Sequence, residues 1–144
     1  MNPGPPRQEP KLHPLIWWVI WAALLTGFLQ VCYFLGGAPG AAPAASIELV
    51  AVLVGAGLLF LSAAIRWLLL PRIGRARVAF ICFIVGQAFA EGCGYVGLFV
   101  GGAHRDPLVA GGVLGLLQFM PIFARRYDGG PAAATAFRGP GGPS

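Results

Sequence analysis

The chain has 144 residues, of which 57% are hydrophobic and only 10% are charged, and its mean hydropathy is +0.74. A water-soluble domain carries about a quarter charged residues, so this composition excludes an ordinary soluble protein. The net charge of +5 does not indicate nucleic-acid binding, because the basic residues lie at the ends of apolar runs and form no stripe. We therefore expect the lipid bilayer to be the main partner and exclude nucleic acid.

The chain begins with a Pro-rich tail, residues 1–13, which is too poor in large apolar side chains to fold alone. A first membrane span is predicted at 14–36, because Pro14 suits a first helical turn and glycines follow at the end of the run. A signal peptide is the alternative, since small residues follow at 42–46. The apolar run is longer than the roughly 7–15 residues of a signal-peptide core, which favours an uncleaved anchor.

Three further apolar runs predict spans at 46–70, 78–102 and 107–123. Each has the roughly 17–25 residues that a transmembrane helix requires. A Gly- and Pro-rich tail, residues 125–144, closes the chain and is not expected to fold. The predicted fold is therefore an all-α membrane protein, a four-transmembrane-helix antiparallel bundle over residues 14–124.

Local signals refine the ends of these spans. Ser46 is a plausible N-cap of the second span, and Glu48 lies in its first turn, where a carboxylate meets the helix dipole. Asp106 is expected to cap the fourth span. Pro121 removes a backbone donor near the end of that span, so we expect a kinked or frayed last turn.

Lys and Arg are distributed unevenly between the two predicted sides of the membrane. If both termini are cytoplasmic, nine basic residues lie inside and only Arg105 lies outside. This asymmetry favours a multi-pass membrane protein with both termini in the cytoplasm. The four tryptophans fall near the cytoplasmic ends of their spans, where an indole suits the headgroup level. The predicted topology anchors are Trp17, Trp18, Trp21, Trp67, Arg72, Arg75, Arg77, Arg125 and Arg126.

Glu91 lies near the middle of the third span. A carboxylate at that depth costs about 2.5 kcal/mol or more, so such residues usually face a bundle interior and mark function. No basic residue is obviously level with Glu91, which favours its neutral form. Glu91 is therefore the proton-carrying candidate. A purely structural role, hydrogen bonding between helices, is the alternative.

Other polar side chains are predicted deep in the membrane: some lie beside Glu91 on the third span, and others lie on the first and fourth spans. Residues four apart share one face of a helix, so these side chains form rows. We expect the rows to combine into one hydrogen-bonded column inside the bundle. The members are Gln87 and Tyr95 on the third span, Gln118 on the fourth, and Thr26, Gln30 and Tyr33 on the first.

Small residues recur at spacings of three and four on the last two spans. Such ridges let neighbouring transmembrane helices approach closely. The predicted helix-packing residues are Gly86, Ala90, Gly94, Gly97, Gly101, Gly111 and Gly115.

The segment GQAFAEGCGYVGLFV, residues 86–100, resembles the carboxylate helix of ATP synthase c-subunit proteolipids. In that family the acid is followed six residues later by Gly-Leu, as Glu91 is followed by Gly97-Leu98, and a basic loop precedes the helix, as PRIGRAR does here. The resemblance implies that Glu91 is a reversible proton carrier. The helix before it has only Gly55-x-Gly57 in place of a long glycine repeat, so we expect no rotor ring. The overall layout resembles small uncharacterised bacterial four-helix integral membrane proteins, and this resemblance implies a location in the bacterial inner membrane.

Three classes of function follow from these features. The first is an accessory subunit that binds another membrane protein or itself through its helix surfaces. The second is a proton-coupled carrier using Glu91, either a proteolipid-like proton-translocating subunit or a proton/cation exchanger like the small multidrug-resistance transporters, whose own acid lies on the first helix. The first span here has no acid.

An enzyme is the third class, and the sequence argues against it. The three cysteines form no CxxC pair, and His13 and His104 are predicted at opposite membrane surfaces. No nucleophile or phosphate-binding loop accompanies Glu91. We therefore predict no enzymatic activity, no cofactor and no metal.

Overall fold

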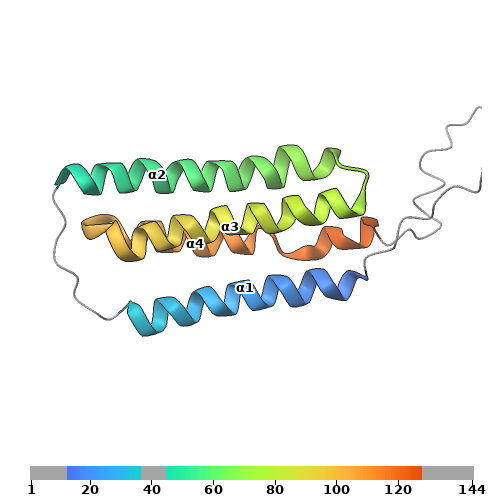
Figure 1. The fold of residues 1–144 in the computed structure, drawn as a ribbon, viewed down its shortest axis with the longest axis horizontal. Helices are drawn as coiled ribbons and strands as arrows, with labels where there is room; N and C mark the ends of the chain where they lie inside the picture. Colours follow the sequence, from blue (N-terminus) through green and yellow to red (C-terminus); the bar gives the residue numbers. More distant parts are fainter. Residues whose placement is uncertain (1–12, 37–44, 128–144) are drawn as a thin grey trace, which may run out of the picture.

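The structure is a computed structural model that describes residues 13–36 and 45–127. Within these ranges it is entirely helical, and four helices run alternately up and down in an antiparallel bundle (Figure 1). Four segments are long and apolar enough to cross a bilayer: 14–35, 46–72, 76–100 and 102–124. The predicted all-α class is therefore confirmed, as are four helices that are long and apolar enough to span a membrane.

The first span, α1, is Pro14–Leu35. Proline occupies its first turn, as predicted, and the side chain of His13 accepts a hydrogen bond from the Leu15 amide at 3.3 Å. Arg105, at the start of the fourth span, donates to the carbonyl of Gly36 and so ties the far end of α1 to a neighbouring helix.

The second span is composite. Its α-helical part, α2, is Ala45–Ala64, with Glu48 in the first turn as expected. It continues as a π-helical turn, η1, over Ile65–Leu69, and then as a short 3₁₀ helix, η2, over Leu70–Arg72. A π-helical turn is a local widening of the helix that occurs frequently at functional sites. Because α2 begins at residue 45, the predicted N-cap, Ser46, lies inside its first turn.

The third span, α3, is Ala76–Val100. A short 3₁₀ helix, η3, covers Gly102–His104, and α4 follows over Arg105–Leu117. Asp106 therefore lies in the first turn of α4 and is not its cap, which corrects the expectation from sequence.

The fourth span is interrupted at residues 118–120, and its last part is a 3₁₀ helix, η4, over Pro121–Tyr127. Proline has no N–H to donate to the carbonyl four residues earlier, that of Leu117. The amide of Met120 bonds to that carbonyl instead, at 3.0 Å. The irregularity expected at Pro121 is thus a break that starts three residues before it.

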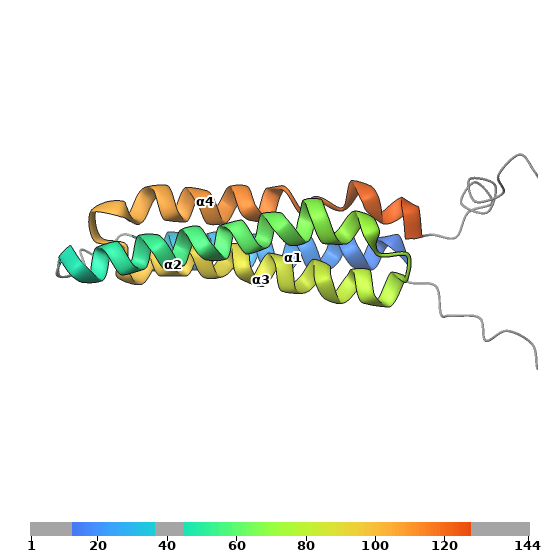
Figure 2. The ribbon, with the colours of Figure 1, turned by 90° about the horizontal axis from the view of Figure 1, so that it is seen from above.

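The bundle is packed unevenly. The central helix, α3, packs most extensively against α4 and then α2, whereas α1 makes far fewer contacts. Figure 2, seen from above, shows the same four helices lying lengthwise beside one another. The backbones of α3 and α4 approach closely at Gly94 and Gly112, since a Cβ added to Gly112 would lie 2.8 Å from the Cα of Gly94. Small residues make this approach possible.

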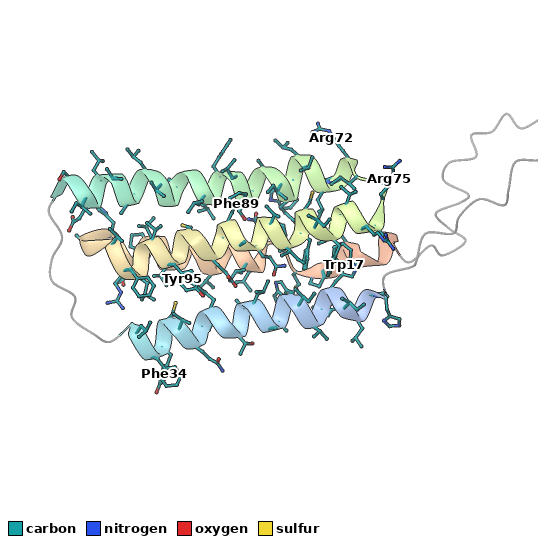
Figure 3. The ribbon with its side chains drawn as sticks, viewed as in Figure 1. Trp17, Phe34, Arg72, Arg75, Phe89 and Tyr95 are labelled. Carbon is teal, nitrogen blue, oxygen red and sulfur yellow. The ribbon has the colours of Figure 1, made fainter. Side chains whose placement is uncertain are left out.

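Trp17 lies in the core near the basic end of the bundle, which we define as the end that carries Arg72 and Arg75 (Figure 3). Its ring is fully buried and meets the rings of Phe80 and Phe83 edge-on, with centroids 5.1 and 5.0 Å away. Trp17 therefore packs the core, a different place from the membrane surface expected of an anchor.

Candidate functional site

Glu91 lies on the middle part of α3, about 22 Å along the helix from Ala76 and about 14 Å from Val100. Its side chain is half-buried, so the isolated bundle does not enclose it. Among the described residues it makes no hydrogen bond and no ion pair. The expected buried glutamate is therefore a partly exposed carboxyl group with no partner in the described part of its own chain.

Gln87 precedes Glu91 by one helical turn and is fully buried. Its Nε2 lies 3.5 Å from the carbonyl oxygen of Phe83, on its own helix. Its Oε1 is buried and has no hydrogen-bond partner within the described ranges. A buried acceptor left without a donor costs roughly 1–3 kcal/mol, so this amide oxygen can accept a further hydrogen bond.

Tyr95 follows Glu91 by one turn and is half-buried. Its ring meets Phe28 of α1 edge-on, with centroids 5.3 Å apart, on the side of α3 that faces α1 (Figure 3). The side of α3 next to α1 therefore carries a polar row, which runs from the buried amide of Gln87 through Glu91 to the half-exposed ring of Tyr95.

Gln118 follows α4 directly and belongs to a second polar cluster, between the fourth span and the second. Its Nε2 donates to the Ser62 hydroxyl and its Oε1 accepts from the indole of Trp67, both at 3.2 Å. Its backbone carbonyl accepts from Nε of Arg66 at 2.7 Å. Both ends of the Gln118 amide are therefore bonded to the second span, and it does not join Glu91 as expected.

This second cluster satisfies the backbone at the break in the fourth span. Trp21 of α1 donates from its indole to the Leu116 carbonyl at 2.9 Å, and this carbonyl also accepts from the Phe119 amide at 3.1 Å. Arg66 donates to the Gln118 carbonyl. The Arg66 guanidinium also lies over the ring of Phe123, 4.5 Å from its centroid. In lipid, backbone groups released from a helix need such partners.

The polar row on α1 is directed away from the bundle. Thr26 and Gln30 are exposed, and Tyr33 is 82% exposed. Neither Thr26 nor Gln30 makes a hydrogen bond with another described residue. The single interior column expected from sequence therefore does not form. Its members are divided between the α3 flank, the break in the fourth span and the outer surface of α1.

The predicted small-residue ridges lie where helices meet. Gly86 faces the ring of Phe119, and Gly94 faces the ring of Phe28. A Cβ on Gly115 would lie 2.7 Å from that of Ala90. The remaining predicted members also have close neighbours: Gly97 and Gly101 beside Arg105, and Gly111 beside Leu59.

Sequence reasoning missed the roles of Ser62, Arg66 and Trp21 in supporting the break. Pro121 was the available signal, because a proline in a span frees a carbonyl that some donor must satisfy. The sequence did not indicate which neighbouring helix would supply that donor.

The site contains no arrangement suited to metal binding in the described ranges, where no three His, Cys, Asp or Glu residues gather. Comparison of the chain with protein-family models, curated proteins and solved structures gives no match. The basis for a functional assignment is therefore the bundle itself: a half-exposed acid on α3, a buried amide beside it and a polar outer face on α1.

Proposed function

We propose that this protein is a small polytopic subunit of an assembly in the bacterial inner membrane, with both termini in the cytoplasm. The observation that carries the proposal is the position of Glu91, half-exposed in the middle part of a membrane helix with no partner among the described residues. A polar group exposed to hydrocarbon without a hydrogen bond costs several kcal/mol. A second polypeptide at this surface would remove that cost.

The uneven distribution of charge supports the proposed orientation. Arg72 and Arg75 lie together at one end of the bundle (Figure 3), and the loop that contains them carries Arg77 as well. Positive residues in short loops remain in the cytoplasm. A reporter fused after residue 144 tests this directly: we expect a cytoplasmic signal, and a periplasmic signal would contradict the orientation.

The subunit proposal is tested by purifying the full chain from its native membrane in polymer nanodiscs and measuring the mass of the particles. We expect a particle of fixed stoichiometry that contains more than one polypeptide. Glu91→Leu should reduce recovery of that particle by about threefold or more, because it removes the polar contact to the partner. Glu48→Gln, at the end of α2, serves as the matched control and should leave recovery unchanged. Particles that contain one chain only would contradict the proposal.

A proton-coupled carrier is the second candidate. The Oε1 of buried Gln87, which has no partner among the described residues, specifically favours it. A protonated Glu91 one turn away carries an O–H donor, and a deprotonated one does not. The amide could therefore hold the proton-loaded form of the acid. A proteolipid-like proton pathway and exchange of protons for cationic substrates both use this step.

Reconstituted vesicles distinguish the carrier from the subunit. We expect a proton flux, or uptake of a cationic dye driven by a pH gradient, that falls at least tenfold in Glu91→Gln and is unchanged in Glu48→Gln. Equal flux in wild-type protein and Glu91→Gln would exclude Glu91 as the proton-binding group.

A further inference from the structure

The outer face of α1 consists of Val19, Ala23, Thr26, Gln30 and Tyr33. All five side chains are exposed, and they lie on the side of the helix opposite the buried Phe28 and Trp17. Their spacing is four, three, four and three residues, the repeat by which two helices pack along a left-handed seam. This spacing indicates a surface suited to another helix.

The outer face of α1 is polar where lipid would surround it. Gln30 lies about 8 Å along the helix from Leu35, and Thr26 lies about one turn deeper. The hydrocarbon core is about 30 Å thick and α1 is about 33 Å long, so the Gln30 amide falls within the hydrocarbon. Because neither side chain has a partner among the described residues, both would be stabilised by a partner outside the chain.

The outward surface of α2 provides the contrast. Its exposed side chains within the span are apolar, for example Leu53, Val54 and Phe60. Such a surface is suited to lipid tails and needs no partner. Exposed polar side chains at depth therefore distinguish the outer face of α1 from the outward surface of α2.

Small residues allow a neighbouring helix to come close to this face. No atom lies within 4 Å of a Cβ added to Gly27, which adjoins Thr26. Ala23 and Gly27 are four residues apart, which gives the small-xxx-small pattern of close helix pairs.

We propose that two copies of this chain associate through the outer face of α1, with their Gln30 amides hydrogen-bonded to each other. Copies with the same membrane orientation are related by a twofold axis along the membrane normal, so each Gln30 meets its counterpart at the same depth. An amide carries both a donor and an acceptor and is therefore self-complementary. A different partner would need its own polar side chain at that depth.

The dimer rests on the proposed function, because it names a second copy as one member of the assembly, bound at a surface other than the one that carries Glu91. Glu91 lies on α3, and the face proposed here lies on α1. The two surfaces can therefore be tested with separate variants.

The experiment counts chains per particle in polymer nanodiscs by single-molecule photobleaching of a dye on the C-terminus. We expect two chains for the wild-type protein. Gly27→Leu should weaken dimerisation about tenfold or more by blocking close approach, and Gln30→Leu about threefold by removing the amide pair. Gly57→Leu is the matched control, since no atom lies within 4 Å of a Cβ added at Gly57 on α2, and it should remain dimeric.

A cross-linking measurement in native membranes tests the same interface without requiring the dimer to survive extraction. In full-length protein with its three cysteines replaced by alanine, Ala23→Cys should form a disulfide-linked dimer in native membranes under mild oxidation. Leu53→Cys, on the outward surface of α2, should not.

The outcomes separate the two proposals. One chain per particle together with a different protein would overturn the dimer and support the subunit role. One chain alone would overturn both. The α1 interface would be overturned by a dimer that is unchanged in Gly27→Leu and Gln30→Leu and that cross-links no more strongly at Ala23→Cys than at Leu53→Cys.

Discussion

The seam between α3 and α4 and the attachment of α1 are two different ways of holding membrane helices together. At the seam, Gly94 and Gly112 bring the two backbones into contact over several turns. By contrast, α1 is held at a few points: the ring of Phe28 against Gly94, the indole of Trp21 on a carbonyl, and Arg105 on the carbonyl of Gly36.

This difference indicates that the two regions have different roles in the stability and adaptability of the bundle. Without a hydrophobic effect between helices in lipid, the strength of association depends on how closely the helices pack and on interhelical hydrogen bonds. The seam has extensive close packing, so we expect it to be the stable scaffold. The helix α1 has local contacts on one side and a polar face on the other, so we expect it to be the adaptable element. Four substitutions test this contrast, from the largest expected effect to the smallest.

Gly112→Leu should break the seam. A Cβ at this position lies 2.8 Å from the Cα and 2.9 Å from the N of Gly94, and backbone atoms cannot rotate away as a flexible side chain can. We expect a loss of about 3 kcal/mol or more in the free energy of unfolding, measured by denaturant titration in detergent micelles. Gly57→Leu has open space and should change it by less than about 0.5 kcal/mol. Similar losses for the two variants would contradict the close seam.

Phe28→Ala should loosen α1 while leaving the seam intact. Phe28 is 1% exposed and fills the space above Gly94. We expect a loss of about 2 kcal/mol, below the roughly 3–5 kcal/mol typical of a soluble core, because lipid tails can solvate part of the exposed surface. Hydrogen exchange should accelerate in α1 and stay unchanged in α3. Acceleration in both helices would show that they unfold as one unit.

Trp21→Phe removes one hydrogen bond and keeps an aromatic ring. The Leu116 carbonyl then loses its indole donor and keeps the Phe119 amide, so the change should cost about 1 kcal/mol. Trp18→Phe is the control, because Trp18 packs on the Trp21 ring and makes no hydrogen bond with a described residue. Equal unfolding free energies for the two variants would mean that the indole bond does not stabilise the break.

Glu48→Gln should have the smallest effect. The Glu48 carboxylate accepts a 3.4 Å hydrogen bond from the amide of Ala103 at the end of the bundle opposite the basic end. A glutamine oxygen can accept the same bond in a solvated setting, so we expect a change below about 0.5 kcal/mol in the same denaturant titration. A loss above 1 kcal/mol would show that this contact contributes to holding α2 against η3.

The four spans could be predicted because their signals are local. A long apolar run is sufficient to define a membrane helix, and proline at the start of α1 marks its first turn. The small residues on α3 and α4 were informative as well, since their spacing defines one face of each helix.

The orientation of α1 could not be predicted from its sequence. The spacing of Thr26, Gln30 and Tyr33 places them on one face, but every other face of α1 is also apolar enough to meet lipid or protein. Which face turns inward is decided by partners on other helices, chiefly the site beside Gly94 that receives Phe28. The burial of Trp17 has the same origin, because the rings that enclose it come from α3 and η4.

The donors at the break in the fourth span could not be predicted from the sequence either. Pro121 indicates that a carbonyl is freed, but Arg66 lies 52 residues away from its acceptor and Trp21 lies 95 residues away. Such pairings depend on how the helices are arranged in space, and local patterns do not contain that information.

The break in the fourth span also changes how far it reaches across the bilayer. With 13 residues, α4 extends about 20 Å at 1.5 Å per residue, which is too short for a hydrocarbon core of about 30 Å. The span continues through residues 118–120 and the first four residues of η4, which rise about 2.0 Å each and add about 8 Å before the span ends at residue 124. Unwinding thus lengthens the span without adding residues, and it matches the thickness that α1 covers with 22 α-helical residues. Stability should therefore depend on lipid chain length, with the fourth span the most sensitive to a thicker membrane.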